Sequence, residues 1–145
     1  MNKVTLLVVV LITLFCLPSQ VLAGDFDGSK PLLCATIEVI ECVPVEGCDR
    51  VTPEAANLPR FLIINFNDKK IVAPRGSETG RTTAIERLEH IDGKLIIEGA
   101  EDGVEGIRDG LGWSMAINEE SGDMVLTASG DRVGFVVFGA CTPKE

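Results

Sequence analysis

The chain has 145 residues, 46% of them apolar, and a formal net charge of −9. This length and apolar content fit one folded domain and exclude a disordered chain. Asp and Glu outnumber Lys and Arg by 22 to 13, and such an acidic chain repels phosphate backbones, so we expect no nucleic-acid partner. A single histidine leaves no room for a metal site built from several imidazoles.

The first 23 residues have the pattern of a secretory signal peptide. Lys3 supplies the basic start, residues 4–17 form an apolar run, and Val21-Leu22-Ala23 is a small-residue cleavage site. The apolar run is shorter than the ~20 residues of a membrane-spanning helix, which disfavours the alternative of an uncleaved anchor. We therefore expect residues 1–23 to be removed. Residues 24–145 then form a single β domain that is periplasmic or secreted and does not insert into a membrane.

Short strands separated by turn residues follow along the mature chain. In the loop after the first strand, Thr52 and Pro53 are typical of the start of a helical turn. Further on, Asp92-Gly93 is the dipeptide of a two-residue type I′ hairpin. The segment 82–91 has a helical competitor, because its apolar residues recur every third position, but its threonines and the following hairpin favour a strand. We predict strands at 32–43, 61–67, 71–74, 82–91, 94–99, 112–118, 123–129 and 133–141.

This pattern predicts the fold class. About eight short strands with regular turns indicate an all-β domain, a single small antiparallel barrel or sandwich. The up-and-down barrel is favoured, because closing an even number of strands puts the start of the first beside the end of the last. Cys34 and Cys141 occupy those two places.

Four cysteines of an exported chain predict two disulfides. A strand separates Cys34 from Cys42, and eight strand residues span about 27 Å, far beyond the ~7 Å that a disulfide allows. Cys42 and Cys48 enclose a short segment that can turn back, so we expect Cys42–Cys48 and Cys34–Cys141. The alternative pairing is Cys34–Cys48 with Cys42–Cys141. A four-cysteine zinc site is disfavoured, because its usual close cysteine pairs are missing.

Two segments carry a resemblance to other proteins. The opening Asp27-Gly28-Ser29-Lys30-Pro31-Leu32-Leu33-Cys34-Ala35 and the ending Ala128-Ser129-Gly130-Asp131-Arg132-Val133-Gly134-Phe135-Val136-Val137-Phe138-Gly139-Ala140-Cys141 resemble a family of small exported bacterial proteins with no assigned activity. The resemblance spans nearly all of the mature chain. It implies export and a single domain, and it implies no activity and no functional residues.

Candidate chemical residues are isolated. His90 has no nucleophile or orienting partner in its sequence context. Residues 112–116 lack the last glycine of a G-x-S-x-G elbow, so Ser114 is expected to face solvent on a strand. Acidic residues at 25–28 and in the Gly-rich segment 101–110 do not have the spacing of a calcium loop. We expect no catalytic residue, no cofactor and no metal.

One stretch remains as a candidate recognition surface. The long Gly-rich segment that holds Asp102, Glu105 and Asp109 leads directly into Trp113, the only tryptophan. Acidic side chains attract a cationic partner over long range, and an aromatic ring supplies a desolvated anchor. The alternative for Trp113 is core packing, because it alternates along a strand with Met115 and Ile117.

The function predicted from sequence is an exported, acidic, non-enzymatic binding or interaction module of the bacterial envelope. Its partner is a protein or a small ligand, and the net charge favours a cationic one. Alternatives are an inhibitor of a basic envelope-attacking enzyme such as a lysozyme, and a lipocalin-like carrier of a small ligand. A small hydrolase that uses two carboxylates is less favoured, because no reactive motif is present.

Overall fold

The computed structural model describes residues 25–74, 82–103, 106 and 110–145. The predicted signal peptide, residues 1–23, lies outside them. The described chain is all β and carries both expected disulfides, Cys34–Cys141 and Cys42–Cys48. The strands are β1 Leu32–Val43, β2 Gly47–Val51, β3 Phe61–Asn65, β4 Lys70–Val72, β5 Thr82–Ala84, β6 Arg87–Ile91, β7 Lys94–Glu101, β8 Leu111–Asn118, β9 Asp123–Gly130 and β10 Val133–Pro143.

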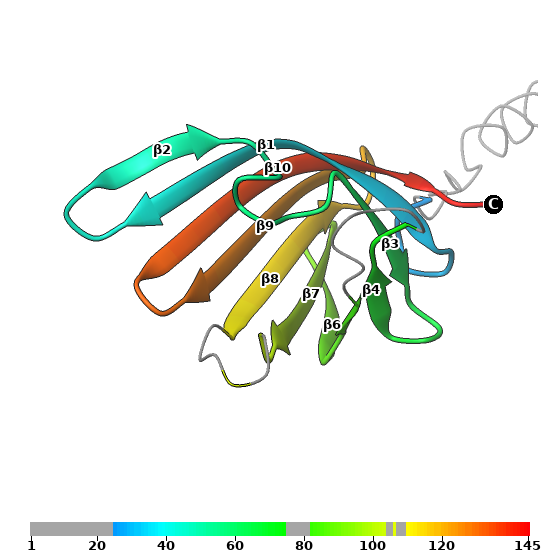
Figure 1. The fold of residues 1–145 in the computed structure, drawn as a ribbon. Helices are drawn as coiled ribbons and strands as arrows, with labels where there is room; N and C mark the ends of the chain where they lie inside the picture. Colours follow the sequence, from blue (N-terminus) through cyan, green and yellow to red (C-terminus); the bar gives the residue numbers. More distant parts are fainter. Residues whose placement is uncertain (1–24, 75–81, 104–105, 107–109) are drawn as a thin grey trace, which may run out of the picture.

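The strands form one antiparallel sheet that curves into a half-barrel (Figure 1). Its order is β5-β4-β3-β1-β10-β9-β8-β7-β6, and β2 pairs with β1 beyond β3. The long β1 therefore has β10 along one edge and two successive partners along the other. The prediction that the first and last strands pair is confirmed, because Cys34 lies directly opposite Cys141.

The single strand expected at 82–91 is wrong, because it is divided into β5 and β6. These strands end the two edges of the sheet, and only Ile85 and Glu86 lie between them. The Ile85 amide donates to the Lys69 carbonyl on the β4 side, and the Glu86 amide donates to the Glu98 carbonyl on β7, both at 2.9 Å. One straight strand cannot pair with both edges, so the chain bends where it passes between them.

The loop expected after the first strand also holds a strand, β2, which the sequence analysis missed. Its residues are short, polar and exposed, so no alternation marks them. Pairing with β1 forms it, with Cys42 opposite Cys48 and Val43 opposite Gly47. Ten strands in the described part of the chain therefore replace the expected eight, and β7 and β10 also run two residues further than predicted, to Glu101 and Pro143.

Two local predictions are confirmed. Asp92 and Gly93 both have positive φ, at 49° and 69°, as a type I′ hairpin requires. Thr52 caps a helical turn, since its hydroxyl accepts a hydrogen bond from the Ala55 amide at 3.2 Å. That turn crosses the concave side of the sheet before β3 begins (Figure 1).

The interior consists of rows of side chains that face one another across β7, β8, β9 and β10. Inward and outward residues alternate along each strand, so the pairing register decides which side chains meet. The first row is Leu95, Ile117, Met124 and Gly139, and the second is Ile97, Met115, Leu126 and Val137. These two rows fill the interior, and their largest side chains are fully or almost fully buried. The third row is Gly99, Trp113, Ala128 and Phe135.

Candidate functional site

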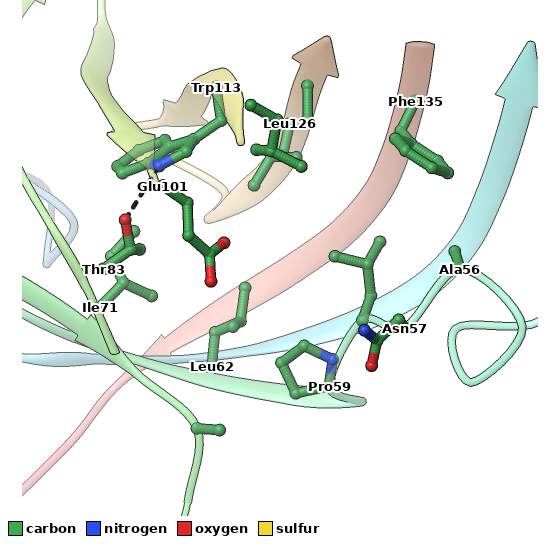
Figure 2. Close-up of a pocket in the computed structure, with 14 residues that line it drawn as sticks. Ala56, Asn57, Pro59, Leu62, Ile71, Thr83, Glu101, Trp113, Leu126 and Phe135 are labelled. Carbon is green, nitrogen blue, oxygen red and sulfur yellow. Dashed lines mark hydrogen bonds between the residues drawn. The ribbon is translucent and has the colours of Figure 1, made fainter. Parts of the chain in front are cut away.

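A pocket lies at the third row. Small and large residues alternate there, because Gly99 and Ala128 flank Trp113, and Phe135 follows Ala128. Because the side chain of Ala128 is small, a pocket of about 100 Å³ remains above it. In Figure 2, Trp113 and Phe135 stand on opposite sides of this space, and Leu126 of the second row lies between them.

The facing wall of the pocket comes from the other half of the sheet and from the capped turn. Leu62 of β3, Ile71 of β4 and Thr83 of β5 line it. So do residues 56–59 of the turn, where the Leu58 amide donates to the Pro53 carbonyl at 2.8 Å. Segments distant in the sequence thus meet around one cavity, and most of the lining is apolar.

An ion pair between Glu54 and Arg60 brackets this turn. A hydrogen bond from the Glu54 backbone amide to its own carboxylate and one from the Arg60 guanidinium lower the pKa of Glu54 below its ordinary value. Both side chains are largely exposed, so the pair holds the turn only weakly in salt solution.

The Trp113 ring is held in place by β5. Its indole nitrogen donates to the Thr83 hydroxyl at 3.1 Å (Figure 2). That hydroxyl donates in turn to the Ala100 carbonyl at 3.2 Å. The ring lies so close to Gly99 that a Cβ there would overlap both the ring and the Ala84 carbonyl oxygen. Glycine at position 99 therefore allows β5 to cross β7 above the tryptophan.

Glu101 supplies the charged group in the described lining of the pocket, which also includes the polar side chains of Asn57 and Thr83. It follows Gly99 and Ala100 on β7 and lies opposite Leu111 of β8. Its carboxylate projects into the space between Trp113 and Leu62 (Figure 2). Among the described residues that line the pocket it is the only ionisable side chain. Glu101 already takes part in an interaction of its own.

A second, more polar recess adjoins the pocket. It measures about 420 Å³ and shares Thr83 and Glu101 with the apolar pocket. Thr82, Ala84, Ala100, Asp102 and Gly103 complete its described lining. A small apolar cavity and a wider polar recess therefore lie side by side, with Thr83 and Glu101 between them.

The residues of the predicted recognition surface lie in different environments. Asp102 is exposed and lines the polar recess. Glu105 and Asp109 lie outside the described residues. Trp113 is only 7% exposed, as its core alternative expects, so its ring is a wall of the pocket and not a surface anchor. A cationic partner for the acids of this segment stays a prediction.

The isolated candidates of the sequence have ordinary partners. His90 Nδ1 lies 2.5 Å from Glu119 Oε1, and the imidazole is about half exposed. The carboxylate of Asp27 accepts a hydrogen bond from the Ser29 amide at 2.9 Å, and hydrogen bonds from Ser29 lower the pKa of Asp27. Within the ranges given above, no cluster of His, Cys, Asp and Glu could hold a metal ion, and no helix has the length and apolar character to cross a membrane.

Comparison of the chain with protein-family models, with curated proteins and with solved structures finds no match. The site therefore rests on its own geometry. The sequence analysis did not identify the other residues that line the pocket. Nothing in the local sequence distinguishes them from ordinary alternating strand residues: Leu62, Leu126, Ala128 and Phe135. Only the register shows that two small residues face two aromatic ones.

Proposed function

We propose that the protein is an exported, non-enzymatic binding module that holds the apolar end of a small molecule in this pocket. The observation that carries the proposal is the third row, where the small side chain of Ala128 between Trp113 and Phe135 leaves a space open, whereas large side chains fill the first two rows. Apolar cavities with a few polar groups at the opening are the usual form of small-ligand sites, and barrel mouths are a common place for them.

The size of the pocket limits the ligand. An engineered cavity of about 150 Å³ is enough for benzene, and this pocket measures about 100 Å³. Sites that enclose drug-sized ligands start at about 300 Å³. Only a short apolar group therefore enters, such as the end of an alkyl chain, and the remainder of the ligand lies in the polar recess beside Thr82 and Asp102.

Two further observations support this choice among the functions considered. Both disulfides suit an oxidising compartment, as export requires. A hydrolase acting through carboxylates needs two of them about 5–10 Å apart across the reacting bond. Glu101 is the only carboxylate in the described lining of the apolar pocket, and Asp102 lines only the recess beside it. No described pair of carboxylates therefore faces across the apolar pocket, which favours binding there.

Trp113 makes the proposal directly measurable, because it is the only tryptophan of the chain and forms a wall of the pocket. The probes are straight-chain alcohols from butanol to octanol, titrated against the mature protein while tryptophan emission is recorded. Each added methylene that enters the pocket contributes about 0.8 kcal/mol, so affinity should rise about fourfold per carbon and level off once the pocket is full.

The matched variants are Ala128→Leu and Thr127→Leu. The first fills the pocket from β9, whereas Thr127 is the neighbouring residue on the exposed outer face. Ala128→Leu should abolish the alcohol response while Thr127→Leu preserves it, with thermal unfolding to show that both variants fold. If Ala128→Leu does not fold, Phe135→Ala takes its place, and it should shift the levelling point to longer chains. An unchanged series in a folded Ala128→Leu or Phe135→Ala variant would disprove the proposal.

A further inference from the structure

The hairpin formed by β1 and β2 extends beyond the rest of the sheet (Figure 1). All five residues of β2 are exposed or nearly so. Residues 44–46 form the tip of this hairpin, between β1 and β2. Val45 in the tip is 103% exposed, which is the highest value among the large apolar side chains of the described residues. A fully exposed valine contributes no packing to the fold that carries it.

The backbone at Val45 is unusual as well. Its φ is 76°, in a region where a β-branched side chain is a genuine outlier. Asparagine or glycine would adopt this conformation more readily. The side chain of Val45 therefore brings strain and no internal contact. Backbone strain of this kind is concentrated at functional sites.

Two connections hold the tip in place. The Cys42–Cys48 disulfide joins directly opposite residues at the base of the turn. Further from the tip, an ion pair joins β2 to β1, with Arg50 Nη2 at 2.7 Å from Glu38 Oε1. A segment fixed in advance loses little conformational entropy on binding, which favours affinity. The tip thus has the properties of a pre-organised contact element.

The charges at and beside the tip indicate the kind of partner. Glu46 in the tip and Asp49 of β2 are exposed, whereas the positive charge of Arg50 is already paired with Glu38. Anionic lipid surfaces repel acidic side chains, whereas basic protein surfaces attract them. This arrangement favours a basic protein over a membrane.

We propose that the hairpin tip is a protein-docking element, in which Val45 enters a shallow apolar pocket rimmed by basic side chains on a partner protein. This surface is distinct from the ligand pocket. The pocket is lined by residues of β3 to β5, β7 to β10 and the capped turn, with none from positions 42–48. Failure of either proposal leaves the other standing.

The first test places a photo-crosslinking benzoylphenylalanine at position 44, an exposed and uncharged position beside Val45, in the cells that produce the protein. A protein adduct should form, and mass spectrometry identifies it. Adding Val45→Asp should reduce its yield about tenfold or more, because burying a valine is worth about that in affinity. Val125→Asp is the matched control, since Val125 is an exposed apolar residue on β9, and it should leave the yield unchanged.

The identified protein is then purified, and its dissociation constant is measured for the wild type, Val45→Asp and Val125→Asp. The same order of effects is expected, with association slowed by added salt. Adducts that are insensitive to Val45→Asp, or adducts with lipid alone, overturn the proposal.

A second measurement checks the premise without a partner. Val45→Asn should raise the thermal midpoint by a few degrees or less, because it relieves the strained φ and removes no buried contact. Val125→Asn is the control and should not raise it. A lower midpoint for Val45→Asn would show that valine is placed there for stability, and the docking proposal would lose its basis.

Discussion

The two ends of the half-barrel are built by the same strands, yet one is filled and the other is open. At the filled end, Ile117 and Met115 are fully buried between large neighbours on β7 and β9. At the open end, the same strands place Gly99 and Ala128 on either side of Trp113. The inward direction of the side chains is identical, and only their volume differs.

The comparison shows that one part of a small domain can contribute stability while another part forms a binding cavity. Close packing of a whole row contributes stability, because every missing methylene in a core is felt. A row that alternates large and small side chains gives up some of that packing and gains a cavity. The buried Cys34–Cys141 disulfide ties the first and last long strands together, which compensates for the smaller core.

The largest expected effect separates the two disulfides. Removing Cys34–Cys141 by the double change Cys34→Ala/Cys141→Ala releases a constraint between residues 107 apart, against 6 for Cys42–Cys48. The chain-entropy model gives about 5 kcal/mol for the first and about 2 kcal/mol for Cys42→Ala/Cys48→Ala. Urea unfolding of both double variants measures this. Equal losses would contradict the chain-entropy account, in which the bond that closes the longer loop contributes more.

An intermediate effect is expected at the open end. Gly99→Ala places a Cβ into the Trp113 ring and the Ala84 carbonyl, so the ring or β5 must move, at a cost of about 1–3 kcal/mol. The emission of Trp113 should change together with stability. Gly112→Ala is the control on the adjacent strand, because a Cβ there meets nothing within 4 Å. Equal behaviour of the two variants would show that the close crossing of β5 and β7 is not required.

The smallest effect concerns the turn that covers the pocket. The folded pKa of Glu54 lies below its ordinary value of 4.5, so its ionised form favours folding. That contribution is present above pH 4.5 and is lost as the pH falls through the lowered pKa. Glu54→Gln should therefore lower the thermal midpoint slightly at pH 7 and not at all in strong acid.

Arg60→Gln tests the same contact from the other side. Its effect at neutral pH should be smaller than that of Glu54→Gln, because the hydrogen bond from the Glu54 backbone to the carboxylate remains, and the double variant should lose no more than Glu54→Gln alone. Additive losses would indicate that the two side chains act separately on the turn.

Much of the architecture followed from local sequence. Alternation of Trp113, Met115 and Ile117 identified the inward-facing side of one strand. Asp92-Gly93 specified the type of the turn between β6 and β7, which needs a positive φ at both residues. The length of a strand excluded a Cys34–Cys42 bond, and the short segment between Cys42 and Cys48 favoured the pairing that the structure has over the alternative Cys34–Cys48 with Cys42–Cys141. These inferences succeeded because they depend on distances along one segment of the chain.

The sequence by itself thus determined the all-β class, several of the turns and the favoured disulfide pairing, since propensity, period and chain length act within short segments. Tertiary structure alone decided that residues 82–91 divide between two sheet edges, that β2 pairs with β1, and that Trp113 forms a pocket wall beneath Thr83. It also decided that Gly99, Ala128 and Phe135 share a row. Such relations depend on the pairing register of separate strands, and no single strand carries the information that fixes it.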